Sequence, residues 1–326
     1  MDTPYEQLQK EFGDRIKVNE PLARYTTFKI GGPADYFYDA KTSEEFVAVV
    51  ARAYALGVPV TILGGGTNVL IGDRGIRGLV VKNSAQSITI RGLKGSIGSG
   101  SSSGVVFVEA DAGVPMNKLV RFTIEEGLAG LEMQLGLPGS VGGAVYMNSK
   151  WTHPTGYVGD AVYQATILDK NGEIKHVPHD YFRFGYDYSN LQQTKEYVVS
   201  VVFALRQDDK DRLWKTANES IAYRRETQPQ GVFSAGCTFK NISKAEALAV
   251  STPNLTTSAG FLVDHAGMKG ARIGDAEISM LHANFIINKV HATASDVVKL
   301  IEKARSAVQN VYHVKLEEEI VRVGEF

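Results

Sequence analysis

Cysteine is almost absent from this sequence: Cys237 is the only one in 326 residues, which excludes an intramolecular disulfide. A chain without disulfides is typical of a reducing compartment. Apolar runs of the roughly 20 residues that span a bilayer are also absent, and the N-terminal segment MDTPYEQLQKEFGDR has no apolar core of a secretion signal. We therefore expect a soluble cytoplasmic protein with no membrane insertion.

Neither sign of charge is in excess. The chain has 35 Lys and Arg against 36 Asp and Glu, a formal net charge of −1. Such a chain has no global field to attract nucleic acid, and no stripe of basic and aromatic residues is evident. We expect no nucleic-acid partner, and we expect locally placed groups to bind any anionic ligand.

The pattern of apolar residues predicts an α+β fold. Helices are expected over residues 42–57, 116–127, 209–226 and 293–311. Strands are expected over residues 58–63, 87–90, 105–110 and 313–323. The last helix should begin with a capping box and bury six residues on one side: Val297, Leu300, Ile301, Ala304, Val308 and Val311.

The length and composition predict two domains. A chain of 326 residues exceeds the usual single domain, and hydrophobic residues at 44% can form a sizeable core. The composition shifts near Gln207, so we divide the chain into residues 1–207 and 208–326. A Gly/Ser-rich run near 92–104 is predicted to be the flexible tip of a hairpin.

Two glycine-rich loops could each hold a phosphate, because closely spaced glycines let backbone N–H groups approach an anion. GGGTNVLIG follows a predicted strand, yet it lacks the Gly-Lys-Ser/Thr of a Walker A loop and has Val69 where the Rossmann pattern needs glycine. GLPGSVGGA fits neither template. The alternative is a tight turn between core strands. Two such loops in one chain favour a dinucleotide site of non-Rossmann type.

A third glycine-bounded segment matches the hydrolase pattern G-x-S-x-G. Residues 100–104, GSSSG, lie in a low-complexity run with no helix after them. That pattern needs a strained turn between a strand and a helix. We therefore do not expect a serine hydrolase.

The ordered motifs resemble the UDP-N-acetylenolpyruvoylglucosamine reductase family over nearly the whole chain. The segments are YTTFKIGGPADYF, ILGGGTNVLI, GLPGSVGGAVYMN, RRETQP, SAGCTFKN, SAGFLVDHAGMKGARIGDAEISMLHANFIIN, TASDVVKLIEKA and LEEEI. The layout resembles the subclass without an extra substrate-capping loop. The resemblance implies an FAD-binding module of the oxidase (PCMH/VAO-like) type in two subdomains, followed by a C-terminal α+β substrate-binding domain.

The resemblance also implies which residues bind FAD. In this family the two glycine-rich loops hold the FAD pyrophosphate, which places Gly64, Gly65, Gly66, Thr67, Asn68, Gly139, Ser140, Gly142 and Gly143 at the cofactor. The first loop has no histidine of the kind that attaches flavin in oxidase relatives, so FAD should be non-covalent. We identify no metal site.

The implied reaction transfers hydride from NADPH through FAD to the enolpyruvyl group of a UDP-sugar, giving UDP-N-acetylmuramate for peptidoglycan synthesis. A protein acid then protonates the adjacent carbon. Cys237 stands where the family motif AGS-x-FKN has its proton-donating serine. A thiol with a pKa near ~8.5 is mostly protonated at neutral pH and can donate. The alternative is a small buried hydrophobic residue.

Glu319 falls where the family has its catalytic glutamate, which helps to polarise the substrate carboxylate. Alternation along a strand places Glu317 and Glu319 on one face and Glu318 on the other, so Glu317 is the fallback. Without the resemblance, the three glutamates would be interpreted as a run of charged residues exposed to solvent. Lys240 and Asn241 match positions near the nucleotide and phosphates of the substrate, and a solvated strand end is their alternative.

One position departs from the family. In RFGYDYSNL, Tyr186 fits the motif GYR-x-S, but Asp187 occupies the place of the arginine that stabilises the developing enolate. An aspartate opposes an anion. Arg183 and Arg225 are candidates for a substitute cation, and we include Tyr186 and Arg225 among the substrate-binding residues. The departure leaves two alternatives open: another FAD-dependent oxidoreductase of the superfamily, or a non-catalytic protein that binds flavin or nucleotide.

Overall fold

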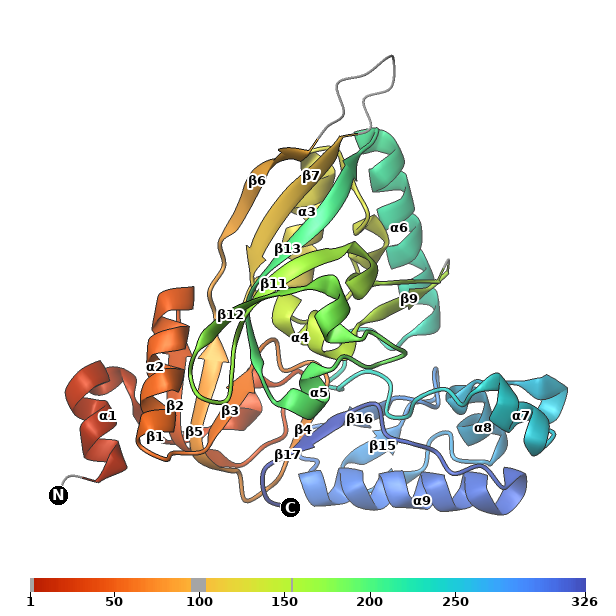
Figure 1. Cartoon of the computed structure of the whole chain (residues 1–326). Helices are drawn as coiled ribbons and strands as arrows, with labels where there is room; N and C mark the ends of the chain where they lie inside the picture. The colour runs from red at the N-terminus through yellow and green to blue at the C-terminus, as the bar shows by residue number, and fades with distance from the viewer. Residues whose placement is uncertain (1–2, 95–103, 154) are drawn as a thin grey trace, which may run out of the picture. The chain divides into compact units, whose positions relative to one another are not determined.

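The computed structural model describes residues 3–94, 104–153 and 155–326 (Figure 1). The chain forms two compact units. The first contains Met1–Val18, Tyr36–Gly65 and Gly78–Arg224, and the second contains Asn19–Asp35, Gly66–Arg77 and Arg225–Phe326. The sequence-based division at 207 differs from this one, because Leu213 and Ala217 of helix α6 (Lys210–Thr227) pack in a core of the first unit. The assignment of a ligand to each domain stays a prediction.

The largest sheet of the first unit is antiparallel. Its strands are β12 (Ile174–Pro178), β11 (Val162–Leu168), β13 (Tyr197–Gln207), β7 (Val105–Asp111) and β6 (Ile88–Lys94), in that order, with β8 (Leu128–Ala129) beside β13. Strand β7 alternates between buried and half-buried residues, so Val106, Val108 and Ala110 enter the core. Helices α3 (Met116–Glu125) and α4 (Val141–Met147) contribute further residues to this core, among them Leu119 and Val145.

The predicted pairing of the strands at 87–90 and 105–110 is confirmed. Ile88 lies opposite Ala110 in the antiparallel pair β6–β7. Most of the predicted flexible tip near 92–104, and most of GSSSG, fall outside the described residues.

A second, smaller core of the first unit lies beneath helix α2 (Ser43–Ala55). It includes Leu8 of α1 (Pro4–Phe12) and Leu79 of β5 (Ile76–Asn83). Strand β3 (Val60–Leu63) pairs in parallel with β5, and the sheet has the order β1-β2-β5-β3, with β1 at Lys17–Pro21 and β2 at Pro33–Ala40. Two cores in one unit agree with the two subdomains implied by the resemblance.

Helix α2, predicted over residues 42–57, begins with Thr42 as its N-cap. Thr42 Oγ1 accepts a hydrogen bond from Glu45 N at 3.2 Å. The Glu45 carboxylate accepts a hydrogen bond from Lys41 N at 2.8 Å and binds both terminal nitrogens of Arg15 at 2.7 Å. The Arg15 guanidinium lowers the pKa of Glu45 to about 2.

The second unit has its own core around helix α9 (Ala294–Tyr312). The capping box of Thr293 with Asp296 is confirmed, and five of the six predicted residues of α9 are buried. Val311 is 55% exposed, so the prediction was wrong at that position, which lies in the last turn beyond the packed surface. Phe28, Ile30 and Leu70 come from the N-terminal segments and join this core.

The strands of the second unit are short. β14 (Arg272–Ile273), β15 (Ala276–Ile278) and β16 (Ile286–Asn288) are antiparallel, and β17 (Val321–Val323) pairs in parallel with β4 (Val69–Ile71). The predicted strand over 313–323 is regular only at β17, because the backbone before it bonds to residues 238–240 instead.

The remaining elements are small. They are α5 (Leu191–Thr194), α7 (Lys244–Ala249), α8 (Ala259–His265), the paired strands β9 (Lys150–Thr152) and β10 (Thr155–Tyr157), and 3₁₀ turns at Gly13–Arg15, Leu22–Tyr25, Glu132–Gln134, Val158–Ala161, His179–Phe182 and Pro253–Leu255. Among the described residues, every helix is too short or too polar to traverse a bilayer.

Candidate active site

The two glycine-rich loops lie against each other in the first unit. A Cβ built on Gly65 would stand 2.7 Å from the Cα of Gly139, and one built on Gly64 would stand 2.3 Å from Ser140 Oγ. At Gly65 backbone thus packs directly on backbone, which only glycine allows. The contact brings together four of the residues predicted to bind FAD.

The second loop is held by hydrogen bonds to the backbone that leads into α3. Gly139 O accepts from Met116 N at 2.9 Å, and Gly142 N donates to Ala112 O at 2.8 Å. The amide of Gly142 is therefore used for packing, and a cofactor contact of Gly142 stays a prediction. A Cβ on Gly143 would lie 3.6 Å from Ser140 Oγ, its nearest neighbour. The glycines of the two loops carry no Cβ, so an anion can approach their backbone closely, which fits a pyrophosphate.

The first loop continues into the second unit. Gly66 has φ +63°, and a Cβ there would lie 2.1 Å from the carbonyl oxygen of Tyr25. Thr67 is half-buried. Asn68 Nδ2 donates to Glu319 O at 3.1 Å, and Val321 N donates to Asn68 O at 2.9 Å. The end of this loop is thus fixed to the segment that holds the predicted catalytic glutamate.

The Cys237 segment lies between two others of the second unit. Cys237 pairs with Phe285, and Thr238 N donates to Asn284 O at 2.7 Å. On the other side Glu319 N donates to Thr238 O at 2.8 Å. Cys237 is half-buried, and Gly236 before it has φ +82° and open space around its Cα. The fold therefore brings the two predicted catalytic residues onto neighbouring segments, and the thiol is not sealed in the core.

Asn284 is a residue of this site that the sequence analysis missed. Its Oδ1 accepts from Phe239 N at 2.9 Å, its Nδ2 donates to Phe239 O at 2.8 Å, and the residue is 3% exposed. Beside it, Asn284 N donates to His282 Nδ1, and burial lowers the pKa of His282. An asparagine inside the apolar run HANFIIN is the one signal the sequence offers.

Replacing Asn284 with alanine should destabilise the protein and misplace Cys237. The change leaves the Phe239 N–H and C=O without partners, and each such buried group costs roughly 1–3 kcal/mol. We expect a loss of about 2–4 kcal/mol in the free energy of unfolding in urea. Asn310→Ala, the same change at an exposed position of α9, should alter it by less than about 0.5 kcal/mol. Equal stability of the two variants would contradict the role of Asn284.

The three consecutive glutamates differ in their surroundings. Glu318 binds Arg305 at 2.6 Å and Arg322 at 2.7 Å, and its side chain is 17% exposed. This ion-pair network stabilises the packing of α9 on the C-terminal segment. Glu319 is half-buried and Glu317 exposed. The two ion pairs set Glu318 apart from its neighbours, and the catalytic role of Glu319 stays a prediction.

The remaining predicted substrate residues are spread over both units. Lys240 is half-buried, and its backbone N–H donates to Glu317 O at 2.9 Å. Asn241 Oδ1 accepts from Ala259 N at 3.0 Å, at the start of α8. Arg225 is exposed near the end of α6, and Tyr186 is 40% exposed.

Asp187 is paired with a cation that the sequence analysis did not name. Lys150 Nζ lies 2.9 Å and 2.8 Å from the two carboxylate oxygens of Asp187. Arg183, one of the two candidates chosen from the sequence, is exposed. No sequence pattern links positions 37 residues apart, so the partner became evident only in the structure.

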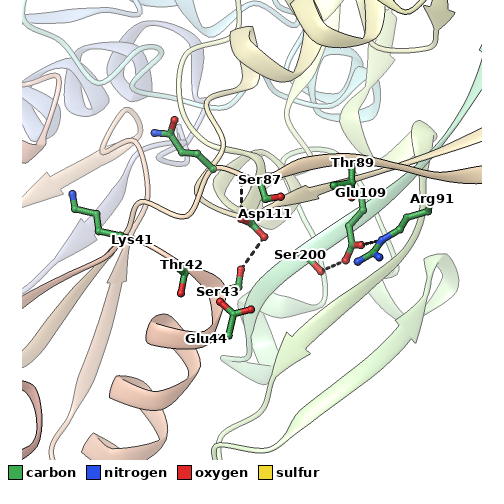
Figure 2. Close-up of a pocket in the computed structure, with 11 residues that line it drawn as sticks. Lys41, Thr42, Ser43, Glu44, Ser87, Thr89, Arg91, Glu109, Asp111 and Ser200 are labelled. Atoms are coloured by element: carbon green, nitrogen blue, oxygen red, sulfur yellow. Dashed lines mark hydrogen bonds and ion pairs between the residues drawn. The ribbon is translucent and has the colours of Figure 1, made fainter.

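A polar cavity of about 650 Å³ in the first unit contains none of the predicted site residues. Figure 2 shows that its charged groups face one another: Glu109 lies between Arg91 and Ser200, and Ser43 donates to Asp111 at 2.9 Å. These polar side chains thus form hydrogen bonds and an ion pair with one another. The described residues hold no cluster of three metal-ligating side chains.

Known proteins resemble this chain over almost its full length. Residues 34–178 match the family description FAD binding domain, and residues 228–323 match UDP-N-acetylenolpyruvoylglucosamine reductase, C-terminal domain. A curated UDP-N-acetylenolpyruvoylglucosamine reductase from Syntrophus aciditrophicus is 37% identical over 324 residues, 98% of this chain and 96% of the relative.

Solved structures agree with these matches. The crystal structure of UDP-N-acetylenolpyruvylglucosamine reductase from Thermus caldophilus is 32% identical, with a TM-score of 0.74 over 95% of this chain and 99% of that one. A VAO-type flavoprotein from Myceliophthora thermophila shares the fold at 10% identity, with a TM-score of 0.56 over 94% of this chain and 84% of that one. The predicted fold class is confirmed.

Proposed function

The chain belongs to the UDP-N-acetylenolpyruvoylglucosamine reductase family, and from this premise we propose which of its residues bind the ligands and carry the reaction. It is an FAD-containing oxidoreductase that uses NADPH to reduce UDP-N-acetylglucosamine enolpyruvate to UDP-N-acetylmuramate in peptidoglycan precursor synthesis. The observation that carries this conclusion is the identity of 37% over 98% of the chain. Bound FAD would supply hydride transfer from NADPH to the vinyl carbon of the substrate.

The two glycine-rich loops would bind the pyrophosphate of FAD. The backbone of Gly64, Gly65 and Gly139 carries no Cβ, which supports this role because an anion can approach these amides closely. The chain has no histidine in the first loop, so FAD would be held without a covalent bond.

Cys237 would donate the proton that completes the reduction. Hydride addition to the vinyl carbon leaves negative charge on the adjacent carbon, and the S–H proton would form the new C–H bond there. The half-buried position of Cys237, beside the Glu319 segment, supports this assignment. Glu319 would polarise the substrate carboxylate, and Tyr186, Arg225, Lys240 and Asn241 would bind the sugar nucleotide.

Location and partners follow from this activity. The substrates are small and soluble, so we propose a cytoplasmic enzyme whose partners are NADPH and the sugar nucleotide, with no nucleic acid.

Absorbance of the purified protein tests the proposed function. The yellow flavin should bleach when NADPH is added without oxygen, and the colour should return on adding UDP-N-acetylglucosamine enolpyruvate. Colour that returns only with oxygen would indicate a different flavin oxidoreductase. A colourless protein, or colour indifferent to NADPH, would refute the proposal.

A further inference from the structure

Lys150 and Asp187 form a largely buried ion pair in which the ammonium group contacts both carboxylate oxygens. Lys150 Nζ lies 2.9 Å from Oδ1 and 2.8 Å from Oδ2, and the two side chains are 15% and 4% exposed. Removing two charges from water is costly, and replacing such a pair by apolar residues often leaves stability unchanged or raises it. The pair therefore calls for a reason other than stability.

The loop that carries Asp187 is tied firmly to the end of α4. Asn148 Nδ2 donates to Gly185 O at 2.9 Å, and Ser189 Oγ donates to Tyr146 O at 2.7 Å. Gln192 Nε2 donates to both Tyr146 O and Asp187 O. Asp187 itself has φ +49°, in the left-handed region that aspartate adopts more readily than most non-glycine residues. These contacts fix the position of the Asp187 backbone.

The ammonium group also lies against an aromatic ring. Lys150 Nζ is 3.8 Å from the centre of the Tyr186 ring, and Tyr186 is 40% exposed. The carboxylate and the ring both attract the ammonium group and hold it in place. The Lys150 ammonium thus lies beside Tyr186, which is accessible to solvent and therefore to a ligand.

Helix α4 connects this charge to the predicted cofactor loop. Its seven residues begin directly after Ser140 and end three residues before Lys150. A helix of that length is about 10 Å long. The loop proposed to hold FAD is therefore joined to Lys150 by one short helix within the first unit.

We propose that Lys150 is a substrate-binding cation of this enzyme, contacting the enolpyruvyl carboxylate, and that Asp187 is the residue that positions it. The inference rests on the proposed function. A fixed ammonium donates a charge-assisted hydrogen bond to the carboxylate and opposes the negative charge that develops next to it. Lys150 also neutralises Asp187, which would otherwise repel an anionic substrate at the position where an arginine was expected.

Single-turnover kinetics of the FAD-loaded protein test this inference. Lys150→Met should leave reduction of the flavin by NADPH unchanged and slow its reoxidation by the enolpyruvyl sugar nucleotide roughly 10²–10³-fold, the usual effect of losing one such donor. Lys150→Arg should recover most of the lost rate. Lys175→Met is a matched control, because Lys175 pairs with the equally buried Asp169 at 2.7 Å in the same unit. The control should not change either rate.

Binding to the oxidised protein gives a readout that does not depend on turnover. Lys150→Met should weaken binding of UDP-N-acetylmuramate, which has the carboxylate, roughly 10–100-fold. It should not change binding of UDP-N-acetylglucosamine, which lacks the carboxylate. A purely structural pair would weaken both ligands or neither, and either result would overturn the inference.

A double variant covers the case in which Lys150→Met does not fold because Asp187 is left buried and unpaired. Lys150→Met/Asp187→Asn removes both charges, and retained yellow colour with a normal rate of reduction by NADPH would report a native fold. Slow reoxidation of this variant by the substrate would support the inference, and a wild-type rate would overturn it. If the enolpyruvyl sugar nucleotide does not reoxidise the flavin of the wild-type protein, the proposed function is refuted, and this inference is refuted with it.

Discussion

Cys237→Ala is expected to slow reoxidation of the reduced flavin by the enolpyruvyl sugar nucleotide roughly 10²–10⁴-fold, the usual contribution of a positioned general acid. Reduction of the flavin by NADPH should proceed at the wild-type rate, because that step needs no proton from the thiol. Anaerobic stopped-flow absorbance of the flavin measures the two steps separately. The half-buried thiol next to the Glu319 segment is the structural basis for this expectation.

Cys237→Ser is the control, since a hydroxyl can replace the thiol as a donor. It should retain much of the activity. If Cys237→Ala turns over like the wild type, Cys237 is not the proton donor.

Gly65→Ala is expected to abolish retention of FAD. The added Cβ would stand 2.7 Å from Gly139 Cα and 3.1 Å from Gly139 C, and both are backbone atoms that no rotamer change can move. The two loops must separate, so the surface that would hold the pyrophosphate is lost. The ratio of absorbance at the flavin band to that at 280 nm, measured on purified protein, should fall to that of an apoprotein.

Gly185→Ala is the matched control for this change. Its Cβ would meet nothing closer than Tyr188 at 3.8 Å, and Gly185 does not have a positive φ. This variant should retain FAD like the wild type. Normal flavin content in Gly65→Ala would show that the close approach of the two loops is not needed for cofactor binding.

Local features of this fold could be predicted from the sequence because each depends on residues a few positions apart. Thr42 caps α2 through Glu45 N, and Thr293 forms its box with Asp296. The alternation in β7 and the helical spacing in α9 are equally local. The glycine-rich loops could be recognised because a close approach of two backbone segments requires glycine, which is visible in the sequence.

Features that depend on distant contacts could not be predicted. The pairing of Lys150 with Asp187 and the clamp of Asn284 on Phe239 each join segments with no shared pattern. The terminal strand was predicted too long for the same reason: residues 317–319 bond to Thr238 and Lys240 rather than to a regular strand. Val311 has the correct spacing but lies beyond the surface that α9 packs against.

The core around α9 includes Phe28, Ile30 and Leu70, which lie far from the C-terminal segment in the sequence. The final strand β17 likewise has its partner at Val69–Ile71. A chimera that took residues 225–326 from one relative and the rest from another would therefore combine two halves of a single hydrophobic core. Recombination between relatives should succeed only when segments 19–35 and 66–77 are exchanged together with the C-terminal one, although they lie far apart in the gene.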